Sequence, residues 1–115
     1  MGNQPIDVTT DAAGFAVIPL DYGEVIAAVF FSSTVASTSF NLVTQDLFNM
    51  GATSANYKAF RDSSGVVKFS AVPITSLAPV VFNPQDMAPL EGLSVAIQLS
   101  TAEAKALKFV KRKYV

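Results

Sequence analysis

The chain has 115 residues, which is enough for one domain with a real hydrophobic core and too few for two. Half of its residues are hydrophobic, 15% are charged, and the formal net charge is −1. Because it contains no Cys and no His, a disulfide framework, a Cys-ligated zinc site and Ser-His-Asp or Cys-His catalysis within one subunit are excluded. We therefore expect a single domain over residues 1–115 that is not an enzyme and has no catalytic residue, metal ligand or bound cofactor. A carboxylate-only enzyme or a Ser-Lys pair stays formally open.

The charges are divided unevenly along the chain. Residues 1–57 hold five acids and no base, whereas residues 103–115 hold five bases and one acid. The basic end has two interpretations: an electrostatic contact with an acidic neighbour, such as another copy of the chain, or a solvated edge strand whose Lys residues discourage aggregation. Nucleic acid is not an expected partner, because no stacking aromatics are interleaved with these bases.

In the N-terminal half, short apolar stretches alternate with Gly, Pro, Asn, Asp and Ser, a texture typical of strands joined by turns. Strands are expected over residues 6–10, 15–20, 24–31 and 40–45. Pro19 has no N–H to donate, so we expect it at an edge or at the end of its strand. The stretch 24–31 is apolar on both faces, which indicates a central strand or one whose outer face another subunit covers.

The second half is less regular. Residues 46–54 fit either a short strand or a helical turn, and 57–61 with 66–72 predict a hairpin around the turn Asp62-Ser63-Ser64-Gly65. Residues 73–92 contain four of the six prolines, and we expect an extended, pre-ordered loop there rather than a helix. Residues 93–100 alternate most clearly, with Leu93, Val95, Ile97 and Leu99 on the core side.

The last segment, 101–115, has two alternatives. Ser100-Thr101-Ala102-Glu103 matches a helix capping box, whereas Leu107 and Phe109 alternate with Lys108 as in a strand. The strand is favoured, because the rest of the chain is β. The complete pattern predicts an all-β fold of about seven to nine short strands, arranged as an antiparallel sandwich or jelly roll.

No membrane partner is expected. The candidate for a membrane span is Val25–Gln45, which has no charge. Only its first seven residues are continuously apolar, and the rest is rich in Ser and Thr. A span needs about 20 mainly apolar residues. Residues 1–10 contain no basic residue and no apolar core, so they do not read as a signal peptide.

The aromatic content points to self-association. Nine Phe and three Tyr exceed what one thin sandwich core holds, and surplus apolar side chains on outer faces indicate subunit contacts. We expect a homo-oligomer, with a trimer as the favoured form. The predicted interface residues are Phe30, Phe82, Lys111, Arg112, Lys113 and Tyr114.

The order of these features resembles the small β-sandwich virion proteins of tailed bacteriophages. The resemblance covers nearly the whole chain and lies in pattern rather than in signature residues. It is carried by five stretches, Val8–Val17 as the first hairpin, Gly23–Val29 and Phe40–Thr44 as the next strands, and Leu90–Ile97 and Phe109–Val115 as the last hairpin. The chain departs from the family pattern in its loop from Phe48 to Arg61 and in its basic end.

This resemblance implies a sandwich fold, self-assembly and a place in the particle, such as a capsid decoration (cement) protein on the capsid exterior. The protein would be made in the host cytoplasm and would bind itself and the major capsid or other virion proteins. The resemblance carries over no catalytic residue. The alternative is a tail or fibre module that recognises a host glycan or protein, with Tyr22 and Tyr57 as the candidate loop aromatics.

Overall fold

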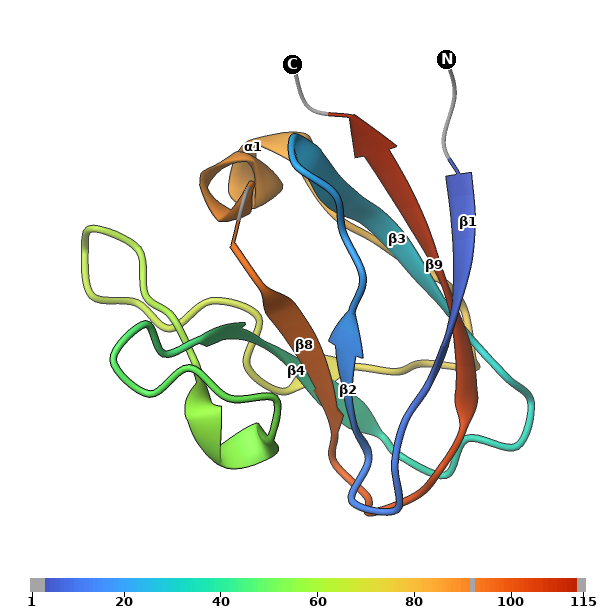
Figure 1. The fold of residues 1–115 in the computed structure, drawn as a ribbon. Coiled ribbons are helices and arrows are strands. Elements are labelled where there is room, and N and C mark those ends of the chain that lie inside the picture. Colours follow the sequence, from blue (N-terminus) through green and yellow to red (C-terminus); the bar gives the residue numbers. More distant parts are fainter. Residues whose placement is uncertain (1–3, 92, 114–115) are drawn as a thin grey trace.

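The computed structural model describes residues 4–91 and 93–113, and in that part of the chain nine strands form two antiparallel sheets packed face to face (Figure 1). The predicted all-β sandwich is confirmed. The four-stranded sheet has the order β1-β9-β3-β7, and the five-stranded sheet has the order β2-β8-β4-β5 with β6 paired to β4. The strands are β1 (Gln4–Thr9), β2 (Phe15–Ile18), β3 (Glu24–Phe31), β4 (Ser39–Gln45), β5 (Tyr57–Lys58), β6 (Val72–Pro73), β7 (Val80–Val81), β8 (Val95–Leu99) and β9 (Ala106–Lys113).

The expectation that residues 73–92 form only an extended loop is wrong. The segment contains α1 (Pro84–Met87) and the 3-10 helix η2 (Ala88–Leu90), which cover one end of the sandwich (Figure 1). Asn83 caps α1 by accepting a hydrogen bond from the Gln85 N–H, and Pro84 stands at the start of the helix, where no N–H is needed. Prolines therefore begin these turns instead of preventing them. Among the described residues, no helix is long and apolar enough to cross a membrane.

The predicted hairpin of 57–61 and 66–72 is mostly irregular. Its turn exists, with the Gly65 N–H donating to the Asp62 carbonyl at 2.9 Å, but only β5, β6 and one isolated bridge carry strand pairing. Phe69 and Ala71 both have a φ of 53°, which takes them out of the extended region. The reason is tertiary, because the Phe69 ring packs between Phe60 and Phe82. Residues 46–53 form no strand either, and the 3-10 helix η1 (Ser54–Asn56) follows them.

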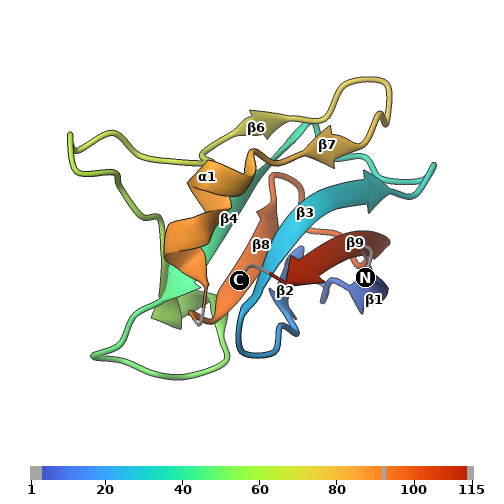
Figure 2. The same ribbon diagram turned by 90° about the horizontal axis from the view of Figure 1, so that it is seen from above.

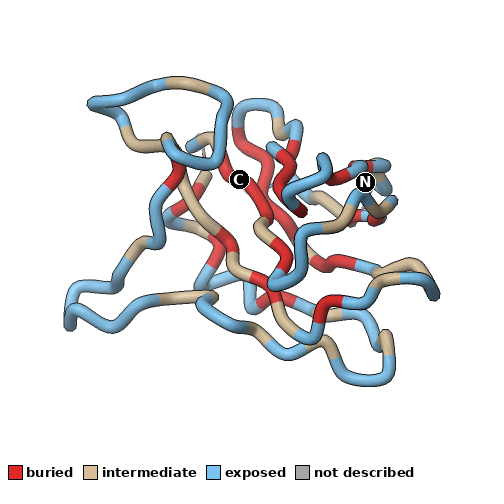
Figure 3. Tube along the Cα trace, turned by 90° about the horizontal axis from the view of Figure 1, so that it is seen from below, coloured by how far each residue is buried: buried red, intermediate tan, exposed pale blue. Residues whose placement is uncertain are grey.

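The contested C-terminal segment is a strand. β9 runs between β1 and β3 in the middle of the four-stranded sheet, and Leu107 and Phe109 are buried as the alternation predicts. The buried residues of the two sheets face each other and form one layer between them (Figure 3). The largest side chains of this core include Phe40, Leu42, Ile97 and Met87.

The chain crosses between the two sheets three times at the lower end in Figure 1, and Thr10, Ser37 and Glu103 hold these crossings together. The Thr10 hydroxyl donates to the Glu103 carbonyl at 2.7 Å and accepts from the Lys105 N–H at 2.8 Å. The Glu103 carboxylate accepts from the Ala36 N–H and from the N–H and hydroxyl of Ser37. These bonds satisfy backbone groups of the β3–β4 and β8–β9 connections and tie the β8–β9 connection to Thr10 in the β1–β2 connection.

Two glycines with similar backbone angles provide a direct test of this junction. Gly14 (φ 80°) and Gly65 (φ 85°) both adopt the left-handed conformation, but a Cβ on Gly14 would lie 2.7 Å from the Thr101 carbonyl oxygen and a Cβ on Gly65 would meet nothing within 4 Å. We expect Gly65→Ala to lower the free energy of unfolding by about 1–2 kcal/mol through backbone strain alone. Gly14→Ala adds a steric clash at the crossing, so we expect a loss of about 3 kcal/mol or more in urea denaturation. Equal losses for the two variants would contradict this account of the junction.

The Glu103 carboxylate should make the fold sensitive to acid. The Ser37 hydroxyl and the Ala36 N–H hold the pKa of Glu103 below its ordinary value of 4.5. Because the lower pKa belongs to the folded state, the ionised group stabilises the fold above pH 4.5, and this contribution is lost as the pH falls through the lowered value. We expect Glu103→Gln to lower stability at pH 7 and to flatten the loss of stability below pH 4.5. The matched control is Asp86→Asn, at an exposed carboxylate with no hydrogen bond among the described residues. If Asp86→Asn reduces the loss of stability below pH 4.5 as much as Glu103→Gln does, the role of Glu103 is refuted.

Candidate interaction surface

The outer face of the four-stranded sheet carries an apolar row that crosses all four strands. The register pairs Pro5 with Val110, Val110 with Ala28, and Ala28 with Val81, so these four side chains share one face. At the two edge strands Val81 is 77% exposed and Pro5 is exposed, whereas in the middle Val110 is half-buried and Ala28 is only 7% exposed. We call these four residues the apolar row. An apolar row on the solvent side of a sheet is the pattern expected where a second protein covers that sheet.

The next row on the same face combines an aromatic side chain with an ion pair. Phe30 lies opposite Lys108, and Lys108 lies opposite Asp7 and binds its carboxylate at 2.6 Å. Phe30 is 43% exposed, as its predicted interface role requires. A hollow of about 380 Å³ opens beside it, between β3 and the start of β9, lined by Asp7, Phe30, Phe31, Ser32, Ala106, Leu107 and Lys108.

The three consecutive bases at the end of β9 do not act together, because successive side chains of a strand point to opposite faces. Arg112 is exposed and shares the outer face with the apolar row. Lys111 points to the other face, where it binds Glu24 at 3.1 Å, and both side chains are largely buried, with exposed fractions of 14% and 10%. The predicted interface role of Lys111 is therefore corrected: its charge is already paired within the chain.

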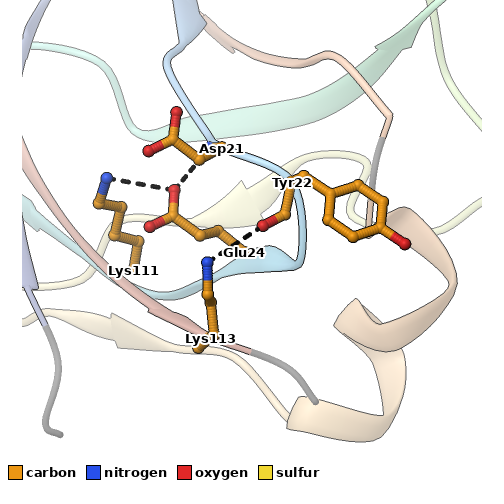
Figure 4. A network of polar contacts seen from close by, with 5 residues as sticks. All are labelled: Asp21, Tyr22, Glu24, Lys111 and Lys113. Atoms are coloured by element: carbon orange, nitrogen blue, oxygen red, sulfur yellow. Dashed lines mark hydrogen bonds and ion pairs between the residues drawn. The ribbon is translucent and has the colours of Figure 1, made fainter.

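Glu24 is one of the few buried charged groups, and its surroundings account for that (Figure 4). Its carboxylate accepts a hydrogen bond from the Asp21 N–H, which is the main cause of its lowered pKa. Lys111 and Lys113 lower the pKa further, and burial opposes them. Lys113 is exposed, and its ammonium donates to the Tyr22 carbonyl at 3.3 Å. Through these contacts, Lys111 and Lys113 at the end of β9 bind the turn between β2 and β3.

Of the two remaining predicted interface residues, the structure describes Phe82. Phe82 is only 5% exposed and packs against Phe40 and Phe69 in the core, so its prediction as an interface residue is wrong for this subunit. Phe82 directly follows β7, which ends at Val81. Because side chains of an extended segment alternate between faces, Phe82 points inward where Val81 points outward. Tyr114 lies outside the described residues.

A second apolar surface was not among the predicted sites. Leu47, Phe48 and Met50 project from the loop between β4 and η1, and Phe48 is 96% exposed. We call these three residues the loop tip. Figure 1 places the loop, in green, beyond the five-stranded sheet and on the side away from β1 and β9. The signal in the sequence was Asp46 followed by Leu47-Phe48-Asn49, a turn former with two large apolar residues at its centre.

Asp46 builds the turn that presents the loop tip. Its side chain accepts hydrogen bonds from the Phe48 N–H at 2.9 Å and the Asn49 amide at 3.1 Å, and both hold the pKa of Asp46 below its ordinary value. The Asn49 N–H donates to the Asp46 carbonyl at 3.0 Å, and the Asp46 N–H donates to the Asn56 carbonyl at 2.7 Å. The loop tip thus stands on a closed, hydrogen-bonded base.

The outer face of the five-stranded sheet is covered by its own side chains. Tyr57 on β5 reaches Phe15 on β2, with ring centroids 5.4 Å apart, above the fully buried Ala96. The Tyr57 hydroxyl and the Ser94 hydroxyl form a hydrogen bond of 2.7 Å. Tyr57 is only 7% exposed, so it is not available as a recognition aromatic, whereas Tyr22 is 86% exposed.

Among the described residues, no three His, Cys, Asp or Glu side chains lie close enough together to hold a metal ion.

No family model, curated protein or solved structure matches this chain.

A double-mutant cycle distinguishes the buried pair from the exposed one. We expect Glu24→Gln or Lys111→Met to cost about 2 kcal/mol each, because each leaves a largely buried charge without its partner, and we expect the double variant to cost less than the sum. For the exposed pair, Asp7→Asn and Lys108→Met should show little coupling, because solvent screens exposed charges. Thermal unfolding at low and at high salt measures both cycles. Similar coupling in the two cycles would contradict the assignment of Lys111 as an internal partner.

Proposed function

We propose that this chain is a structural protein of the virion of a tailed bacteriophage, acting as a decoration (cement) protein on the capsid exterior. It is made in the host cytoplasm, associates with itself, favouring a trimer, and binds the major capsid or other virion proteins by adhesion. The observation that carries the proposal is the apolar row on the outer face of the four-stranded sheet, with Phe30 and Arg112 beside it.

The mechanism is adhesion without chemistry. Burying the apolar row and Phe30 against a neighbour supplies the driving force, and Arg112 offers a charge-assisted contact to an acidic group of that neighbour. The loop tip lies on the opposite side of the sandwich, so both surfaces can be occupied at once. A protein with two separate adhesive surfaces can bridge its neighbours, and a lattice of many copies multiplies each modest contact.

The alternative is a tail or fibre module that recognises a host glycan or protein. The exposed aromatic side chains of Tyr22 and Phe48 favour it, because stacking and apolar contacts of such residues are typical of recognition loops. The burial of Tyr57 removes one of the two aromatic side chains on which this alternative rested. Saturable binding of the isolated protein to host cells, without binding to capsids, would favour the alternative over decoration.

The proposal predicts that one exposed residue of the apolar row controls attachment. Val81→Asp should leave the fold intact, because Val81 is 77% exposed, and should weaken binding to capsids that lack this protein by about tenfold or more. Val66→Asp is the matched control, at a valine that is 57% exposed on the loop after Gly65. Co-sedimentation with purified capsids measures both variants. Mass spectrometry and cryo-electron microscopy of purified virions test the location, and absence of the protein from the particle would remove the proposal.

A further inference from the structure

The two methionines that the structure describes lie in opposite environments. Met50 belongs to the loop tip and is 68% exposed, whereas Met87 in α1 is 1% exposed and packs in the hydrophobic core. The third methionine, Met1, lies outside the described residues. A reagent that attacks methionine from solution therefore reaches Met50 directly and reaches Met87 only when that part of the fold opens.

The thioether of Met50 is the one exposed sulfur of the described residues. The chain has no Cys and no Trp, so it offers no thiol and no indole that would react in its place. Hydrogen peroxide oxidises a thioether to a sulfoxide. The sulfur lone pair attacks one peroxide oxygen, an S–O bond forms and the O–O bond breaks. The other oxygen keeps both hydrogens and leaves as water, so the sulfur is oxidised and the peroxide is reduced.

The loop holds the backbone beside Met50 without using its side chain. The Asp46 carboxylate accepts a hydrogen bond from the Phe48 N–H at 2.9 Å, and the Gln45 side-chain amide donates to the Gly51 carbonyl at 3.3 Å. These bonds fix the chain before and after the methionine, and neither involves the thioether. Oxidation therefore changes the exposed side chain and leaves the hydrogen bonds that build the loop.

Oxidation of Met50 makes the loop tip polar. Leu47, Phe48 and Met50 are all exposed, and adhesion through them depends on removing their apolar surface from water. A sulfoxide carries a polar oxygen, and burying a polar group without a hydrogen-bond donor costs free energy. One added oxygen atom thus converts a side chain that favours contact into one that opposes it. The apolar row lies on the other sheet and contains no methionine, so it is unaffected.

From these observations we infer that Met50 is an oxidation site for peroxides and that its sulfoxide weakens the loop tip as an adhesive surface. The fold and the apolar row stay intact in the oxidised protein. The inference deepens the proposed function and rests on it for the partner, because it gives one of the two adhesive surfaces a redox control. Methionine sulfoxide is reduced again by sulfoxide reductases, so this control is reversible.

The first test measures which methionine reacts. The full chain is treated with dilute hydrogen peroxide and digested, and mass spectrometry assigns the added oxygen to each methionine. We expect Met50 to react at least about tenfold faster than Met87, because a buried thioether reacts only after local opening. In urea that unfolds the protein, the two rates should become equal. Comparable rates in the folded protein, or no reaction at Met50, would overturn the inference.

The second test measures the apolar character of the surface with two variants. Met50→Leu keeps an apolar side chain that peroxide does not oxidise, and Met50→Gln introduces a polar side chain. Because Met50 is exposed, both variants should fold as the wild type does. Peroxide-treated wild type and untreated Met50→Gln should elute earlier from a phenyl column than untreated wild type. Met50→Leu retains Met1 and Met87, so it is the matched control, and peroxide should not shift its elution. An equal shift of Met50→Leu would overturn the inference.

The third test connects the oxidation to capsid binding. In co-sedimentation with capsids that lack this protein, peroxide should weaken binding of the wild type at least about fivefold and leave binding of Met50→Leu unchanged. The first two tests need no capsid, so a protein that passes them but is absent from virions would refute the proposed function alone. A wild type that binds capsids equally well before and after oxidation of Met50 would refute the inference alone.

Discussion

The fold depends on the hydrogen-bonded junction where the chain crosses between its two sheets. A sandwich whose strands alternate between sheets must bring several connections to the same end, and each connection carries backbone groups that need partners. The Thr10 hydroxyl and the Glu103 carboxylate supply those partners, with Ser37 between them. Glu103 is separated in sequence from Ser37 by 66 positions and from Thr10 by 93. A small set of polar side chains therefore fixes three connections.

A second polar cluster does the same at the other end. Glu24 binds the Asp21 N–H and Lys111, and Lys113 binds the Tyr22 carbonyl, so the turn between β2 and β3 is tied to the end of β9 (Figure 4). Polar contacts stabilise both ends of the sandwich, and apolar side chains fill the space between its sheets. The side chains on the outer surfaces are therefore not needed to stabilise the fold and can contact other proteins. This division explains how the chain tolerates an apolar row with two exposed ends and an exposed loop tip on opposite sides.

Much of the fold was predictable, because the local pattern and the tertiary contacts agree for the long strands. β3 is buried on both faces as its apolar run predicts, and the alternation of β9 is confirmed. β8 is a strand as expected, but two of its predicted positions are wrong. Leu93 precedes the strand and is 38% exposed, and Ala96, expected on the outer side, is fully buried beneath Phe15 and Tyr57. The segment from 57 to 92 was predicted poorly. There Phe69 leaves the extended region to pack against Phe82, and Pro84 starts a helix capped by Asn83. In that segment packing overrides the local signals.

The sequence by itself determined the all-β class, the places of the long strands, and the presence of more apolar side chains than one thin core uses. These properties follow from composition and from a period of two residues, and both are local. Only the tertiary structure decided which surplus side chains are exposed, placing Phe30 and Phe48 outside and Phe82 inside. It also decided that Lys111 serves Glu24 while Arg112 faces solvent. For Phe30, Lys111 and Arg112 the physical reason is the register of β9 against β3, with its irregularity between Ile26 and Ala28. This register pairs residues 76 to 89 positions apart, from Phe31 with Leu107 to Glu24 with Lys113, and has no local signature.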